Sequence, residues 1–487
     1  MIAVALAVLF AMLFPADVPW ICDEPMLIHN ALQANAVESL APHGLMGTQG
    51  VQYGPLPTWF YQAYLSFSHN MVLLVTVRAL LFAAVLVAAL ACVARVARLS
   101  KWGICLLLFS PSIWLYSRLI WDNTFCIPLS LVAVAFYALF LNGRRWAAGA
   151  TILACGGLLL VHLMSVPLIA AITLHAVCYR RRELFQARWA IVAALAGVGI
   201  AGARYWPVLI HGLAGGGQEL HFPGRPAMLF TIDGGQWLSG MGFDYVVGQE
   251  WLDGAPAALR LALLLSGVVH LLVLGGAILA GRHIYRVWRG TTPADRVFDL
   301  AWVCFATLLI QFVYFGVRGA VDQPHYYNAS WFAYGFLAWL ALDRMQRYVL
   351  GRIAGVLAIA LPAACVVMLA VELHRTHGTR ALHYGPTLGD QVAVARVLSQ
   401  AGPTAQVFCE VPAIVQIPQR ILVLQELMGT APLKVPATGQ GVVIHFRNDN
   451  PRDGGVYAEA FPMAGSTGTA SSSATPAAAT QSIPITK

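Results

Sequence analysis

Residues 2–24 read IAVALAVLFAMLFPADVPWICDE, an apolar segment followed by two adjacent carboxylates. A helix needs about 20 apolar residues to cross the hydrocarbon core of a bilayer, so we read residues 2–19 as a membrane span. Asp23 and Glu24 then lie just past that span, and no Lys or Arg precedes Arg78. A plain membrane anchor does not need an acidic loop of this kind. The pattern indicates a site at the membrane surface where a carboxylate does chemistry or holds a cation.

The composition of the whole chain is that of a membrane protein. Of its 487 residues, 59% are hydrophobic and 11% are charged, whereas a soluble protein carries roughly 25% charged residues. Apolar runs of about 20 residues recur along the chain, as expected of transmembrane helices. We therefore predict an all-α polytopic membrane protein. The nine cysteines show no CxxC or metal-ligand spacing.

The basic residues indicate the topology. The net charge of +8 could suggest nucleic acid, but the basic residues fall in short clusters between apolar runs, as in cytoplasmic loops. Under this positive-inside rule we predict about 11 spans, the third of them over residues 102–116, a cytoplasmic N-terminus and no nucleic-acid partner. The clusters are Arg95, Arg98 and Lys101; Arg144 and Arg145; Arg180, Arg181, Arg182 and Arg188; Arg282, Arg286, Arg289 and Arg296; and Arg344, Arg347 and Arg352.

Three segments of this topology are not simple membrane spans. Residues 146–179 have basic residues at both ends, so we predict two short helices with a break near residues 162–167. Long outer loops are predicted at residues 20–70 and 207–255. In the second of these loops, residues 215–217 are glycines that lack the strand and the Lys-Ser/Thr of a phosphate-binding loop. We read them as a flexible outer segment or a lid.

The C-terminal part is predicted to form a small extracytoplasmic α/β domain over residues 380–460. Residues 388–399 have apolar side chains at helical spacing, and residues 405–411 and 441–446 have the character of strands. Residues 464–487 are rich in Ala, Ser, Thr and Gly in their first part, cannot build a core and are predicted to be disordered.

The polar residues of interest collect on the outer side of the predicted topology. They are Asp23, Glu24, Tyr53, Arg118, Asp122, Asn123, Arg204, Asp322, His325, Tyr326 and Tyr327. A transporter or a proton pump more often carries ionisable residues at the bilayer midplane. A site at the outer interface lies instead where a lipid phosphate would be.

Four short sequence elements occur in a defined order along the chain. They are the short first span with Asp23 and Glu24, then GPLPTWFY at residues 54–61, then Ser110-Pro111 followed by Arg118 and Asp122, and finally PHYY at residues 324–327. This order resembles the polyprenyl-phosphate-sugar-dependent glycosyltransferases of the GT-C membrane fold, among them protein mannosyltransferases and lipid A aminoarabinose transferases. The resemblance covers about residues 1–345 and implies a GT-C-like domain over residues 1–373.

The resemblance implies roles on the acceptor side of the site. Asp23 would be the general base that takes a proton from the acceptor, and Glu24 would orient Asp23 or hold the acceptor. Asp122, Asn123 and Tyr53 would position acceptor or donor. The two acids could instead only cap a helix, since acids favour a helix N-terminus. Asp122 could also form an ion pair with Arg118, four residues earlier.

On the donor side, the leaving group is a lipid phosphate, which Arg binds well. The residues implied are Arg118, Arg318, Arg204, His325, Tyr326 and Tyr327. The arginines could instead be interfacial side chains that reach for water, and the tyrosines could belong to the aromatic belt. His162, at the predicted hairpin break, could face the lipid phosphate or be a buried core histidine. We predict no metal cluster, and we leave a divalent cation open.

The leading prediction is therefore an integral-membrane glycosyltransferase of the bacterial inner membrane. It would transfer a sugar from a polyprenyl-phosphate-linked donor to a glycan, lipid or protein acceptor at the outer face of the membrane. Two alternatives stay open. One is a transporter or flippase for a lipid-linked glycan, and the other is a non-catalytic membrane assembly protein whose exported C-terminal domain recruits partners.

Overall fold

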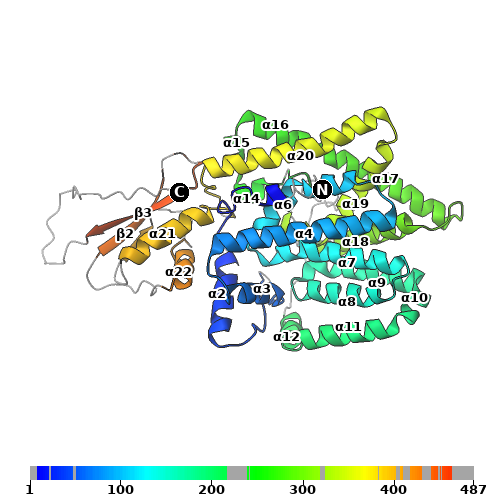
Figure 1. Ribbon diagram of the computed structural model, residues 1–487, viewed down its shortest axis with the longest axis horizontal. Helices are drawn as coiled ribbons and strands as arrows, with labels where there is room; N and C mark the ends of the chain where they lie inside the picture. Colours follow the sequence, from blue (N-terminus) through cyan, green and yellow to red (C-terminus); the bar gives the residue numbers. More distant parts are fainter. Residues whose placement is uncertain are drawn as a thin grey trace.

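Helices long and apolar enough to cross a membrane dominate the computed structural model (Figure 1). The structure describes residues 8–20, 23–47, 51–215, 238–240, 242–318, 324–381, 383–401, 406–409, 417–429, 440–447, 450 and 452–462. Five such spans occur among these residues: α4 (Met71–Ala97), Asp122–Leu141 with α7 (Cys126–Leu141), Ala257–Trp288 with α16 (Ala257–Ser266) and α17 (Val268–Trp288), Arg296–Val313 within α18 (Arg296–Arg318), and α20 (Val349–Arg375). The predicted helical membrane class is confirmed, whereas the count of eleven spans stays a prediction.

Two predicted spans differ from single straight helices. The predicted third span, residues 102–116, is divided into α5 (Trp102–Leu108) and α6 (Pro111–Arg118). Ser110 is extended, with φ −61° and ψ 127°, because a residue before proline avoids the helical region. The predicted first span is helical at residues 8–11 and irregular from residue 12 to residue 20, and residues 1–7 lie outside the described part.

The predicted hairpin over residues 146–179 is confirmed. It consists of α8 (Trp146–Leu159), the short 3₁₀ helix η2 (Leu163–Ser165) and α9 (Val166–Tyr179). His162 breaks the helix with φ −159° and accepts a hydrogen bond at Nδ1 from the Met164 N–H at 3.1 Å. Pro167 then stands in the first turn of α9, where its missing N–H has no cost.

The predicted first outer loop contains two helices, α2 (Asp23–Ala36) and α3 (Leu56–Leu65). The start of α3 is attached to the hairpin break, because the N–H groups of Gly54 and Leu56 donate to the carbonyls of Val161 and Leu160 at 3.3 and 3.0 Å. A side chain on Gly54 would collide with the Leu160 backbone. Only glycine therefore lets the loop approach the hairpin this closely.

Gly54→Ala should lower the free energy of unfolding by about 1–3 kcal/mol, the usual cost of overpacking. Thermal unfolding of the purified protein in detergent would show the loss as a lower midpoint. Gly157→Ala is the matched control on α8, because its new Cβ would meet only Leu56 Cδ2 at an ordinary 3.7 Å. Equal midpoints for the two variants would refute the proposed close packing at Gly54.

The remaining membrane-side helices complete the bundle. They are α10 (Arg181–Gln186), α11 (Arg188–Ala201), α12 (Trp206–Gly215), α14 (Asp244–Val247), α15 (Gln249–Asp253), the 3₁₀ helices η1 (Asp122–Phe125) and η3 (Pro324–Ala329), and α19 (Trp331–Met345). The core is centred on α19, which packs against α17, α18 and α5 and buries Trp331 and Trp339 completely.

The C-terminal unit contains the predicted helix and both predicted strands. Its elements are α21 (Leu388–Ala401), β1 (Gln406–Cys409), α22 (Ile417–Leu427), β2 (Gln440–Phe446) and β3 (Val456–Pro462). The sheet order is β1-β2-β3, with β1 and β2 parallel and β2 and β3 antiparallel. The helix α22 lies between the two parallel strands in the chain, as such a crossover requires. The predicted disordered tail, residues 464–487, lies outside the described part.

This unit is joined to the N-terminal segment at one end of the bundle, where α22 lies next to α2 (Figure 1). Pro19 and Thr387 form a β-bridge, and the Leu388 N–H donates to the Val18 carbonyl at 2.8 Å. Glu426 on α22 accepts hydrogen bonds from Gln33 and contacts His29, both at 3.0 Å. The helix α2, which begins with Asp23, is therefore held by the C-terminal unit.

Candidate active site

Three short 3₁₀ helices meet at the end of the bundle that adjoins the C-terminal unit. η3 contacts both η1 and η2, and η1 also contacts α2 and α3. Each of the three turns precedes a membrane helix: η1 leads into α7, η2 into α9, and η3 through Ser330 into α19. Residues far apart in the sequence are brought together here, and they include most of the predicted site.

Asp23 lies in the first turn of α2, half-buried beside this junction. Trp121 Nε1 donates a hydrogen bond to Asp23 Oδ2 at 2.6 Å. Burial raises the pKa of Asp23 above its ordinary value, while the Trp121 hydrogen bond and the His383 charge partly oppose that rise. A carboxylate with a raised pKa accepts a proton more readily, and the indole N–H fixes its direction. Trp121 itself was not among the predicted site residues.

Glu24, the next residue, is almost fully buried, with 3% of its surface exposed. It interacts electrostatically with Arg78 and with Tyr61 of α3. The two acids of the predicted pair therefore have different surroundings. Asp23 is accessible and bonded to an indole, whereas Glu24 belongs to a buried charged group.

Arg78 is a second residue that the sequence analysis missed. Its side chain is completely buried, and its guanidinium carbon lies 4.4 and 4.9 Å from the ring centroids of Phe82 and Phe125. It donates to the Ser117 carbonyl at 2.8 Å and to Thr124 Oγ1 of η1. Arg78 thus connects α4 to η1. A signal was present, because an arginine inside a membrane helix is usually functional or structurally required.

Asp122 and Asn123 form the start of η1. Asp122 Oδ1 accepts from the Asn123 N–H at 2.6 Å, and Asp122 Oδ2 is buried without a hydrogen-bond partner among the described residues. Asn328 Nδ2 donates to Asn123 Oδ1 at 3.0 Å, which joins η3 to η1. Asp122 lies close enough to Asp23 for the two carboxylates to interact.

The predicted ion pair between Arg118 and Asp122 is wrong. The helix α6 ends at Arg118, and Leu119 is extended with ψ 135°, so the two residues do not lie on one helical turn. The Arg118 guanidinium instead donates to the Phe14 carbonyl and lies 4.6 Å from the Trp114 ring centroid. It also interacts with Asp17 and Tyr384. Arg118 therefore holds the segment before α2.

His325, Tyr326 and Tyr327 form the first part of η3. His325 is buried, its ring centroid lies 4.9 Å from that of Trp121, and its Nδ1 has no hydrogen-bond partner among the described residues. Burial, aided by His162 and His383, lowers the pKa of His325 to about 3. The imidazole is therefore neutral. Tyr326 packs against His325 at 4.4 Å, while Tyr327 is buried against Tyr334.

Tyr53 and His162 lie together at the hairpin break, with ring centroids 3.9 Å apart. Burial lowers the pKa of His162 to about 3, so this imidazole is neutral as well. His162 directly precedes η2 and His325 lies in η3. Because η2 contacts η3, the segments that carry these two histidines are adjacent. The structure thus places Tyr53 and His162 on the hairpin side of the junction.

Two predicted arginines are not placed in this junction. Arg204 is exposed in the turn between α11 and α12. Arg318 ends α18, and its side chain lies outside the described residues. Residues 216–237 and Asp322 also lie outside them, so the predicted lid over the site stays a prediction. Among the described residues, no group of three or more His, Cys, Asp or Glu side chains could hold a metal ion.

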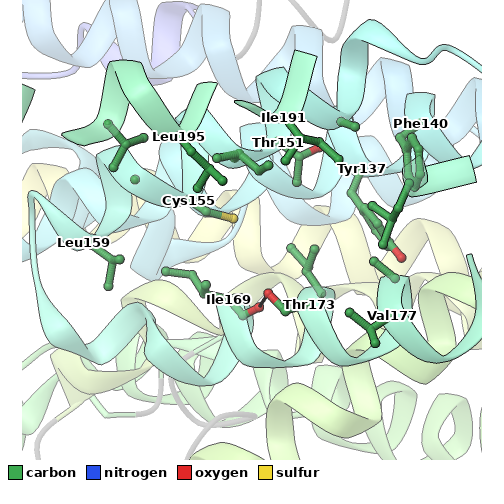
Figure 2. A pocket seen from close by; sticks show the side chains of 17 residues that line it. Tyr137, Phe140, Thr151, Cys155, Leu159, Ile169, Thr173, Val177, Ile191 and Leu195 are labelled. Atoms are coloured by element: carbon green, nitrogen blue, oxygen red, sulfur yellow. Dashed lines mark hydrogen bonds between the residues drawn. The ribbon is translucent and has the colours of Figure 1, made fainter. Parts of the chain in front are cut away.

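An apolar cavity of about 360 Å³ opens between α7, α8, α9 and α11 (Figure 2). Figure 2 shows Leu159 at one end of it and Phe140 and Val177 toward the other, with Cys155 between. Leu159 is the last residue of α8. The cavity therefore extends along the apolar helices from the end of α8, which is close in sequence to the break at His162.

The arrangement is that of a helical membrane protein with a GT-C-like fold, in which the candidate site lies beside the C-terminal unit, as the sequence resemblance implied. No protein-family model and no curated protein matches the chain. The chain is similar to a solved structure, the crystal structure of ArnT from Cupriavidus metallidurans bound to undecaprenyl phosphate. The TM-score is 0.52 at 12% sequence identity, over 94% of this chain and 97% of that chain. This similarity confirms the predicted fold.

Proposed function

We propose that the protein is an integral-membrane glycosyltransferase that takes its sugar from a polyprenyl-phosphate-linked donor and transfers it at the outer face of the membrane. The observation that carries the proposal is the Asp23 carboxylate, held by Trp121 at 2.6 Å where the three 3₁₀ helices meet. Its support is the fold shared with a protein that binds undecaprenyl phosphate.

In the proposed reaction, Asp23 is the general base. The acceptor hydroxyl gives its proton to the Asp23 carboxylate as its oxygen attacks the anomeric carbon of the donor sugar. The bond from that carbon to the phosphate oxygen breaks, and the polyprenyl phosphate leaves with the electron pair. A positioned base contributes typically about 10²–10⁴-fold to such a step. The burial that raises the pKa of Asp23 strengthens it as a base.

We assign the donor to the hairpin side of the junction. The polyprenyl tail would lie in the apolar cavity between α7, α8, α9 and α11, which has the apolar lining that such a chain requires. Its phosphate would then lie beside His162 and His325. These neutral rings can donate a hydrogen bond, and Arg318 would supply positive charge. Arg118 has no part in this proposal, because it binds the segment before α2.

The orientation in the membrane is also a proposal. The N-terminal end of α4 lies toward Asp23, since Arg78 in its second turn bonds η1, and its other end carries the Arg95, Arg98 and Lys101 cluster. Basic clusters mark the cytoplasmic side. The site and the C-terminal unit would therefore face the outside of a bacterial inner membrane.

The test is transfer of radiolabelled sugar by membranes that contain the protein, from a panel of polyprenyl-phosphate sugars. Label that enters a lipid, protein or polymer fraction supports the transferase. Movement of a lipid-linked glycan across the membrane without transfer of its sugar would support the flippase alternative. If neither activity is observed and undecaprenyl phosphate binds normally, the result would favour the assembly-protein alternative.

A divalent cation is tested separately. Asp23 and Asp122 are the two interacting carboxylates of the junction, and two carboxylates are few for a resident cation, which takes about six ligands. We therefore expect transfer to continue in an excess of EDTA. A rate that disappears with EDTA and returns with Mg²⁺ or Mn²⁺ would show that a cation binds with the donor.

A further inference from the structure

Four rings form an arc that begins at Asp23, which we call the aromatic arc: Trp121, His325, Tyr245 and His383. Trp121 donates to Asp23 and lies 4.9 Å from His325. Tyr245 lies 6.0 Å from His325 and stacks on His383 at 4.4 Å with an interplanar angle of 18°. His383 in turn interacts electrostatically with Asp23. The arc therefore returns toward the carboxylate from which it starts.

His383 comes from the connector between α20 and the C-terminal unit. The connector is a tight hairpin in which Gly378 and Pro386 form a β-bridge and the Thr379 N–H donates to the Gly385 carbonyl at 2.9 Å. Tyr384, the residue after His383, is buried, and its hydroxyl donates to the Asp17 carbonyl at 2.7 Å. A residue held in this way has a defined place beside the site.

Tyr245 comes from α14, within the second outer loop. Gly248, directly after α14, has φ +86°, and a side chain there would come within 2.9 Å of Ala381 in the connector. The loop and the connector therefore pack together beside the stacked rings of Tyr245 and His383. Five separate parts of the chain contribute to the arc and to Asp23.

The surroundings of the arc favour an uncharged ligand. Trp121, Tyr245 and His383 are only partly buried. The nearby Asp23 carboxylate would repel a phosphate. The two buried arginines of the described junction, Arg78 and Arg118, direct their guanidinium groups to other protein oxygens.

We propose that the three partly exposed rings of the aromatic arc, Trp121, Tyr245 and His383, form the acceptor subsite, and that they take the uncharged, hydroxyl-bearing face of a sugar rather than a phosphate group. The proposal rests on the transferase function proposed above. A sugar ring presents C–H groups that pack on aromatic faces, and its hydroxyls donate to carboxylates. A sugar lying on Tyr245 and His383 would direct a hydroxyl toward Asp23, while the donor phosphate occupies the hairpin side.

Saturation-transfer NMR on the full-length protein in nanodiscs tests this assignment with two probes, methyl glycosides and sugar 1-phosphates. We expect methyl glycosides to bind the wild type. Tyr245→Ala and His383→Ala should weaken that binding by about three- to tenfold, the value of one aromatic contact. His383→Phe, which keeps a ring, should restore most of it.

His445→Ala is the matched control, because His445 stacks on Tyr457 within the C-terminal sheet at 5.2 Å and is not part of the arc. It should bind methyl glycosides like the wild type. Equal binding by all variants, binding of sugar 1-phosphates alone, or binding of neither probe by the wild type would overturn the proposal. Binding of undecaprenyl phosphate, measured in parallel, reports on the donor side. If the wild type did not bind undecaprenyl phosphate, that result would count against the transferase function itself.

Discussion

Membranes that carry Asp23→Asn should transfer sugar about 10²–10⁴-fold more slowly than membranes that carry the wild type, which is the usual contribution of a general base. Asparagine keeps the shape of the side chain and can still accept a hydrogen bond from Trp121, so the fold should survive. It cannot take the acceptor proton. The measurement is the initial rate of label transfer at equal expression.

Asp253→Asn is the control for this change, because Asp253 is exposed at the end of α15 and, among the described residues, its side chain accepts a hydrogen bond only from Gln249, four residues earlier, at 2.7 Å. Its transfer rate should equal that of the wild type. If Asp23→Asn transferred label as fast as the wild type, Asp23 would be structural. The base would then have to be sought at Glu24 or Asp122.

The pH dependence gives an independent check of the same assignment. Asp23 acts as a base only when ionised, so the rate should fall as the pH drops through its pKa, which burial holds above the ordinary value. The Trp121 hydrogen bond lowers that pKa. Trp121→Phe should therefore move the acidic limb of the profile to higher pH. An unmoved limb would mean that another group controls it.

The second large effect is expected at Arg78. Arg78→Met keeps most of the side-chain volume but removes the hydrogen bonds to the Ser117 carbonyl and to Thr124. Hydrogen bonds of a charged group are worth about 1.5–3 kcal/mol each, so loss of the two bonds should lower the free energy of unfolding by about 3–6 kcal/mol. Denaturant unfolding in detergent measures this loss. Transfer should fall as well, because η1 loses its link to α4.

Arg95→Met is the matched control on the same helix, because Arg95 is exposed near the other end of α4. Its stability should stay within about 0.5 kcal/mol of the wild type, as for most surface substitutions. If Arg78→Met were equally stable and equally active, the buried guanidinium would not organise the site.

Local patterns in the sequence were sufficient for the elements that depend on local physics. The break at His162 follows from basic residues at both ends of a segment too long for one crossing, and Pro167 then begins the second helix. The strands β1 and β2 follow from short segments with the character of strands, QVFC at residues 406–409 and VVIHF at residues 442–446. The third span was predicted to end at residue 116, close to the end of α6 at Arg118. The extended residue Leu119, which separates Arg118 from Asp122, was missed because no breaker residue marks it.

The candidate site was predictable only in part, for a related reason. Asp23, Asp122 and His325 stand in recognisable sequence contexts, and the structure brings them to one junction. Trp121, Tyr245 and His383 have no motif, and their meeting depends on how the second outer loop and the connector pack. Arg118 illustrates the opposite error. Its type and spacing suggested a phosphate ligand, but its burial beside Phe14 gives it a structural contact instead.

The β-bridge between Pro19 and Thr387 has a consequence for biosynthesis. The segment that leads into Asp23 leaves the ribosome early. Thr387, which pairs with that segment, and His383 follow only after α20 and the membrane helices before it have been made. The nascent chain can therefore insert its helices into the bilayer long before the candidate site is complete. Under the proposed function, sugar transfer would begin only after the C-terminal unit has paired with this segment, so a prematurely terminated chain would stay inert and would not consume the donor lipid.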